Sequence, residues 1–254
     1  GCADEGRALR QILTEKANVS VLAGHLDDPS PAVHGAAMRR LARLRQPAAD
    51  AALREALARL DVPQRRELLA SLLDSGRGDT RVQGLLLALL RDAAPLVRRT
   101  AVVGLRDVPG ALSSALWSVL VEELAHAAPA RRRAAAATIE ARRWEAVAPL
   151  TRALDAKPER GAKRIRRLLG RITGRAPSSD WRAFAKSAEV RLLALAERGS
   201  WPRDKAAILK VLDDRAAGRP AQRAAIRALA HLAPSVEGLK LLLARTHLDL
   251  ATTV

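Results

Sequence analysis

The chain has 254 residues, of which 48% are hydrophobic and 28% are charged, and its formal net charge is +17. Its mean hydropathy is -0.07, and no stretch approaches the roughly 20 apolar residues of a membrane-spanning helix, which excludes such a helix. Cys2 is the one cysteine, so an internal disulfide framework and a Cys-x-x-Cys metal site are also excluded.

The first quarter of the chain has the pattern of helices separated by turns. Apolar side chains at Ala8, Leu9 and Ile12 recur at helical spacing. A strong start signal follows, because Ser30 can cap a helix and Pro31 suits its first position, where no N–H is needed. The helices predicted here cover residues 5–18, 19–26, 32–45 and 48–60.

An apolar anchor then recurs with a period of about 32 residues, which is typical of a repeat array whose units pack only on their neighbours. The anchors, separated by 32, 32, 34, 30 and 60 residues, are Leu41, Leu73, Leu105, Ile139, Leu169 and Leu229. Prolines open the segments of the first four: Pro31, Pro63, Pro95 and Pro129. Residues 95–108 align without gaps on 31–44, and looser copies lie at 63–73, 129–139, 162–172 and 222–232. Partner helices are predicted at 81–91, 111–126 and 145–155.

The rhythm breaks at residues 173–180, which are rich in turn-forming residues. A helix is predicted from Trp181 to Arg198, and further helices start at 201–202, 219–220 and 234. We predict an all-α fold, an α-α superhelix of about seven helical pairs forming one domain over 1–254. The clearest repeats cover 31–172, the insertion 173–180, and less regular pairs 181–254.

Two short segments carry a family resemblance. Asp28-Pro29-Ser30-Pro31-Ala32-Val33-His34 and Asp92-Ala93-Ala94-Pro95-Leu96-Val97-Arg98 resemble the HEAT-like repeat of phycobilisome-lyase type, Asp-x-x-Pro-x-Val-Arg before an Ala-rich helix. In that family the arginine pairs with the aspartate of the turn. Arg98 fits this position, Arg66 and Arg132 fit it less closely, and His34 departs from it.

A second resemblance concerns the break itself. Leu169-Gly170-Arg171-Ile172-Thr173-Gly174, followed by Asp180-Trp181, is similar to an element of HEAT-repeat proteins from bacteria with large genomes, many of them lipoproteins. The resemblance implies a structural tryptophan that fills a gap between repeats. HEAT-like alkylpurine DNA glycosylases, which hold a damaged base with Trp and Asp, offer a catalytic alternative at Asp180 with Trp181 or at Asp204 with Trp201.

Catalytic patterns are missing from the sequence. It holds no GxxxxGK[ST], HExxH or GxSxG motif, and its five histidines are isolated. The His-Glu pairs of di-iron HEAT-repeat hydroxylases are likewise absent. We therefore expect no enzyme activity, no cofactor and no metal site.

Basic residues gather on two of the predicted helices, and they are the candidate contacts for an anion or partner. They are Arg131, Arg132, Arg133, Arg160, Lys163, Arg164, Arg166, Arg167, Arg171 and Arg175. One interpretation is a solvated helix face with ion pairs between repeats. The other is an anion-binding groove with strongly salt-dependent affinity.

These patterns predict a non-enzymatic scaffold that binds another macromolecule on the concave face of the solenoid, with a protein as the first partner. The alternative is a nucleic-acid-binding module, of DNA-repair or glycosylase-like type, using an Arg-rich groove. A third is an accessory subunit of an enzyme, as in chromophore lyases. We expect a monomer. Gly1-Cys2 resembles the cleavage site of bacterial lipoproteins, which lies immediately before the cysteine that is lipidated, so Cys2 is a candidate for lipidation. The alternative is an arbitrary chain boundary at Gly1. The expected location is either the bacterial envelope, with Cys2 as the only membrane anchor, or the cytoplasm.

Overall fold

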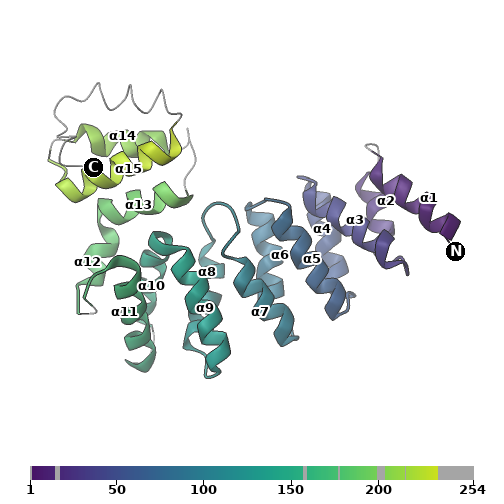
Figure 1. The fold of residues 1–254 in the computed structure, drawn as a ribbon, viewed down its shortest axis with the longest axis horizontal. Helices are drawn as coiled ribbons and strands as arrows, with labels where there is room; N and C mark the ends of the chain where they lie inside the picture. The colour runs from purple at the N-terminus through teal and green to yellow at the C-terminus, as the bar shows by residue number, and fades with distance from the viewer. Residues whose placement is uncertain are drawn as a thin grey trace. The chain divides into compact units, whose positions relative to one another are not determined.

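A computed structural model describes residues 2–14, 18–156, 159–176, 178–198, 204–214 and 216–233. Within these ranges the chain forms fifteen α-helices and one 3-10 helix, with no strand, so the all-α prediction is confirmed (Figure 1). The chain divides into two compact units, Gly1–Leu116 and Trp117–Val254, with the boundary inside α8 (Ser114–Ala125). Whether residues 1–254 act as one domain stays a prediction.

The first unit is a stack of helices in two layers. Its helices are α1 (Cys2–Leu13), α2 (Val19–Gly24), α3 (Pro31–Arg43), α4 (Pro47–Leu57), α5 (Val62–Asp74), α6 (Thr80–Leu90) and α7 (Pro95–Gly104). The odd-numbered helices α1, α3, α5 and α7 contact one another in succession, and so do the even-numbered α2, α4 and α6. Contacts between every second helix are the signature of stacked helical pairs, so the predicted α-α repeat architecture is confirmed.

The second unit contains more varied helices. Those after α8 are α9 (Pro129–Ala141), η1 (Arg143–Ala146), α10 (Val147–Leu154), α11 (Glu159–Thr173), α12 (Trp181–Lys186), α13 (Ala188–Arg198), α14 (Lys205–Asp213) and α15 (Arg219–Leu232). The predicted helix 145–155 is thus divided into η1 and α10. The single helix predicted from Trp181 to Arg198 is also wrong, because Ser187 is extended (φ -64°, ψ 150°) and separates α12 from α13. The helix starts predicted at 201–202 and 234 lie outside the described residues.

Most of the apolar anchors lie in the core. Leu41, Leu105, Ile139, Leu169 and Leu229 are fully buried. The sixth anchor, Leu73, is half-buried and lies against Gly104, where an added Cβ would come within 2.4 Å of a Leu73 methyl group. The anchor at Leu73 therefore contributes to the close packing of α5 against α7.

The turn before the proline-opened helices uses the same hydrogen bond several times. Ser30 caps α3 as predicted, and the Asp28 carboxylate accepts a hydrogen bond from the Ser30 backbone N–H at 2.9 Å. Asp92 accepts in the same way from Ala94 at 2.7 Å. Before α9, the imidazole Nδ1 of His126 takes this role and accepts from the Ala128 N–H at 3.0 Å. A histidine thus substitutes for the aspartate of the turn.

The arginine of the repeat binds backbone carbonyls rather than the aspartate. Arg98 Nη1 donates to the carbonyl oxygens of Asp92 and Ala93. The Asp92 carboxylate instead pairs with Arg65 of the preceding repeat, with Nε and Oδ2 2.7 Å apart. Arg65, not Arg66, is therefore the arginine equivalent to Arg98, because Pro63 is the second residue of α5 whereas Pro95 is the first of α7.

Arg132 and His34 occupy the same fourth position in their helices. Arg132 Nη1 donates to the carbonyl oxygens of His126 and Ala127, as Arg98 does in its own repeat. His34 is buried, and its Nε2 has no hydrogen-bond partner. The departure from arginine at His34 therefore removes the contact to the turn.

Ion pairs join residues about one repeat apart in sequence. In the first unit they are Asp27–Arg59, Arg39–Glu67, Asp50–Arg77 and Arg65–Asp92; in the second they are Glu140–Arg171 and Asp155–Arg182. Many arginines of this basic chain therefore connect neighbouring repeats.

Arg77 makes the most buried of these connections. It lies between α5 and α6, and both its side chain and that of Asp50 on α4 are 2% exposed. Its guanidinium forms a two-bond fork with Asp50 at 3.0 and 3.1 Å and donates to the carbonyl oxygens of Ala42 and Leu44. Burial alone would lower the pKa of Arg77, but Asp50 and Asp79 raise it, so the charge is retained.

Candidate functional site

Of the ten basic residues expected to bind a partner, most make interactions within the chain. On α9, Arg131 pairs with Glu123, which raises the pKa of Arg131, and Arg132 binds turn carbonyls. On α11 and just beyond it, Arg164 donates to the Ala125 carbonyl oxygen at 3.5 Å. Three more pairs are Arg166–Glu159 at 3.0 Å, Arg171–Glu140 at 2.6 Å and Arg175–Glu189 at 3.7 Å.

The other four basic residues are exposed cations. Within the described ranges no ion pair involves Arg133, Arg160, Lys163 or Arg167. They project from α9 and α11, whose apolar sides are buried, and none of them lines a pocket described below. The two interpretations of this surface thus apply to different residues.

The aromatic residues near the break form a buried cluster. Trp181 and Phe184 are 4% and 7% exposed, and their rings meet edge to face with centroids 6.1 Å apart. Arg175 lies over the Phe184 ring at 3.9 Å. The Asp180 carboxylate caps α12 by accepting from the N–H groups of Arg182 and Ala183. Asp180 and Trp181 therefore serve the fold and do not form an open Trp–Asp cleft.

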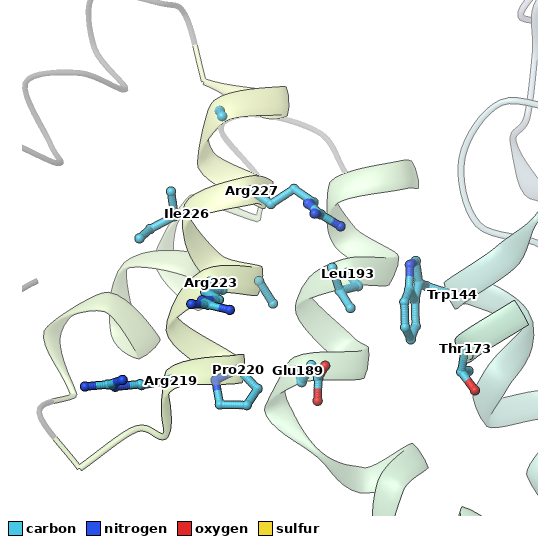
Figure 2. A pocket seen from close by; sticks show the side chains of 11 residues that line it. Trp144, Thr173, Glu189, Leu193, Arg219, Pro220, Arg223, Ile226 and Arg227 are labelled. Carbon is cyan, nitrogen blue, oxygen red and sulfur yellow. The ribbon is translucent and has the colours of Figure 1, made fainter. Parts of the chain in front are cut away.

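A large open groove lies in the second unit, and we call it the Trp144 groove. It consists of two hollows of about 1090 and 550 Å³ that share Trp144, Leu193 and Arg227. Figure 2 shows Leu193 and the Arg227 side chain on the side of α13 and α15 that faces Trp144. The remaining lining residues are Ala141, Arg143, Thr173, Glu189, Ala196, Glu197, Arg219, Pro220, Arg223, Ala224, Ile226, Ala230 and His231.

Trp144 is held in place from several sides. Its backbone N–H donates to the Glu197 carboxylate at 3.1 Å, and its ring meets Phe184 edge to face at 6.4 Å. Just before it, Arg142 is fully buried and pairs with Glu145 at 2.7 Å. Arg143, which lies between Arg142 and Trp144 in the sequence, has φ 34°, a left-handed conformation that costs a non-glycine residue about 1–2 kcal/mol. Such strain is often found at functional sites.

Cations line the opposite wall of the groove. Arg219, Arg223 and Arg227 recur at every fourth residue of α15, so successive arginines are neighbours on the helix surface, and all three are exposed. Within the described part of the chain, no ion pair involves Arg219, Arg227 or Arg143, whereas Arg223 does have an interaction. The groove therefore offers cationic side chains that the fold does not use.

The two acidic residues of the groove are already engaged. Glu189 pairs with Arg175, and Glu197 accepts the hydrogen bond from Trp144. The charge of Glu189 is therefore partly balanced by Arg175, and one oxygen of Glu197 is occupied by a backbone donor. The sequence interpretation missed this site, although the four-residue spacing of the arginines over 219–227 was a visible signal. The link to Trp144, many residues earlier, depends on the tertiary fold.

Within the described ranges, no group of three or more His, Cys, Asp or Glu side chains is placed to hold a metal ion. None of the described helices combines the length and apolarity needed to cross a bilayer. The side chain of Cys2, the candidate for lipidation, lies outside the described part of the structure.

Comparison with known proteins does not assign the chain to a family. No protein-family model matches it, and no curated protein matches it.

Proposed function

We propose that this protein is a non-enzymatic binding module, in which stacked helices form a scaffold and the Trp144 groove holds a segment of a partner macromolecule. The observation that carries the proposal is the difference between two sets of arginines. Those that connect repeats have carboxylate partners, whereas Arg219 and Arg227 line a large open groove without an ion pair in the described structure. A protein is the favoured partner, because the groove walls mix apolar and cationic side chains.

Peptide selection against the full chain tests this proposal. A random peptide library displayed on phage would be panned over the wild-type protein, and selected peptides would be measured by fluorescence anisotropy. Groove variants Arg227→Glu and Arg143→Glu reverse exposed charges, so they should fold, which circular dichroism checks. We expect both groove variants to bind the selected peptides more weakly than the wild type does, while Arg160→Glu on α11 leaves peptide binding unchanged. Peptides that bind all four proteins equally would contradict the proposal.

A nucleic-acid-binding function is the second candidate, and the exposed cations of α9 and α11 favour it. Arg133, Arg160, Lys163 and Arg167 have no ion pair in the described structure and could meet phosphates. Stacking of bases on the rings of Trp181 and Phe184 would add little affinity, because both side chains are buried. Loss of duplex DNA binding at physiological salt would exclude this candidate.

A further inference from the structure

We propose that the Trp144 groove recognises an extended acidic peptide segment in which two carboxylates flank one apolar side chain. This inference rests on the proposed function and names the partner's chemistry.

The charge of the groove favours an anionic occupant. Arg227 lies where the two hollows meet, Arg219 lines the larger one, and Arg143 lines the smaller one. The acidic lining residues Glu189 and Glu197 already have partners. A carboxylate entering the groove therefore gains cations that have no intramolecular ion pair and meets acids that are already hydrogen-bonded or paired.

The spacing of the arginines matches an extended chain. Arg219 and Arg227 are eight residues apart on α15, which corresponds to about 12 Å at 1.5 Å per residue. In an extended peptide, residues i and i+4 are about 13 Å apart and point to the same side. Two carboxylates in an acid-x-apolar-x-acid pattern can thus reach Arg219 and Arg227 together.

The apolar wall accounts for the central residue of the pattern. Residue i+2 of the peptide faces the same side as the two acids. Arg223 lies between Arg219 and Arg227 on α15, and next to these arginines the larger hollow is lined by Leu193 on α13 and by Trp144 (Figure 2). An apolar side chain placed there loses contact with water and fixes the register of the peptide.

A peptide is favoured over a nucleic acid for the same groove. A single strand presents a base with every phosphate and would need several exposed aromatic rings for stacking. Among the described lining residues, Trp144 is the one Trp, Tyr or Phe side chain of the groove, and the neighbouring rings of Trp181 and Phe184 are buried. Each apolar contact on the α13 and α15 side comes from aliphatic residues, which suit an aliphatic side chain.

The test uses a fluorescein-labelled peptide with a Glu-Ala-Leu-Ala-Glu core flanked by Gly and Ser, and the full-length chain. We expect Arg219→Ala and Arg227→Ala each to weaken its binding about three- to fivefold, as for exposed ion pairs. Arg160→Ala removes the same charge from α11 and should change the dissociation constant less than about twofold. Equal weakening by all three variants would overturn the inference.

Matched peptides test the two parts of the pattern. Replacing both Glu by Gln should abolish the dependence on Arg219 and Arg227, and replacing Leu by Ala should weaken binding to every variant. A peptide of the same composition with the two Glu side by side should bind more weakly. Equal affinity for all these peptides would overturn the inference, as would single-stranded DNA that binds the groove more tightly than the core peptide.

Failure of this inference is distinguishable from failure of the proposed function. Peptides selected on phage that depend on Arg227 but carry no acidic residues would refute the acidic pattern and leave the binding module intact. Selected peptides that bind independently of Arg143 and Arg227 would refute both.

Discussion

At the scale of single residues, the difference between buried and exposed ion pairs decides which arginines matter for stability. Arg77 and Asp50 are almost inaccessible to solvent, whereas Arg59 and Asp27 are about half exposed or more. A buried charge that loses its partner stays in a low-dielectric environment, while an exposed one is solvated by water. Both pairs join residues about one repeat apart, but losing the buried pair should cost more stability than losing the exposed one.

Removing Arg77 should lower the stability of the first unit far more than removing Arg59 does. We expect Arg77→Ala to cost about 3–5 kcal/mol in the free energy of unfolding, because Asp50 and two carbonyl oxygens lose their donor. Urea titration followed by circular dichroism measures this loss. The matched variant Arg59→Ala, which removes an exposed pair one repeat away, should have a far smaller effect. Similar losses for the two variants would contradict the distinction.

The Asp79 carboxylate gives the first unit a dependence on acid. Burial alone would raise the pKa of Asp79, but hydrogen bonds from Val82 and Arg77 outweigh it, so the pKa is lowered from 3.8. Because the pKa of Asp79 is lower in the folded than in the unfolded chain, its carboxylate stabilises the fold above about pH 4. This stabilisation is lost as the pH falls through the pKa of the folded state. The helix cap of α6 and the contact to Arg77 weaken together.

Asp79→Asn separates the charge from the cap. Asparagine caps helices as well as aspartate does, but it does not titrate. We expect the variant to be less stable than the wild type near neutral pH and to lose less stability between pH 4 and pH 2. Thermal melts across this range, followed by circular dichroism, provide the measurement. Parallel pH profiles for the two proteins would show that Asp79 has no such role.

At the scale of elements, the sequence predicted the helices well where a local signal marks their ends. Ser30 with Pro31 correctly placed the start of α3. Errors arose where the signal was not local. Pro63 lies one residue later in its helix than Pro95 does, so aligning the prolines pointed to Arg66 in place of Arg65. The break between α12 and α13 at Ser187 is not marked by a neighbouring proline or glycine in the sequence.

The site was less predictable than the helices because its parts come from distant segments. The arginine clusters on α9 and α11 are contiguous in sequence and therefore conspicuous. The Trp144 groove joins Trp144 to α13 and α15, and only tertiary packing brings these together. Sequence also does not reveal which arginines have carboxylate partners one repeat away, such as Arg171 with Glu140.

Close packing between helices of successive repeats can be tested at a glycine. A methyl group at Gly104 of α7 would lie 2.4 Å from a Leu73 methyl group on α5. We expect Gly104→Ala to destabilise the first unit by about 1–3 kcal/mol, as overpacked cores do. Gly84→Ala on the exposed face of α6 should instead stabilise it by up to about 1 kcal/mol, because nothing obstructs the methyl group and alanine favours helix. Urea titrations compare them, and stabilisation by Gly104→Ala would contradict the contact.

At the scale of the whole molecule, the net charge of +17 must be separated from the specific chemistry of the groove. A chain this basic attracts any polyanion, and the attraction follows the number of phosphates neutralised rather than the place where the cations lie. Binding to DNA or heparin alone is therefore no evidence for the groove. Two pairs of exposed arginines on different helices make the separation possible.

The double variants Arg160→Ala/Arg167→Ala on α11 and Arg219→Ala/Arg227→Ala on α15 each lower the net charge by two. We expect both to reduce the slope of log affinity for duplex DNA against log salt by similar amounts, up to about 0.9 for each lost phosphate contact. Only the α15 variant should weaken the acidic core peptide. Anisotropy titrations at several salt concentrations measure both ligands with the same proteins. If the salt slope for duplex DNA falls for the α11 variant alone, a nucleic-acid site lies on α11. If the affinity for the acidic core peptide falls equally for both variants, the peptide responds only to net charge, which would contradict the groove.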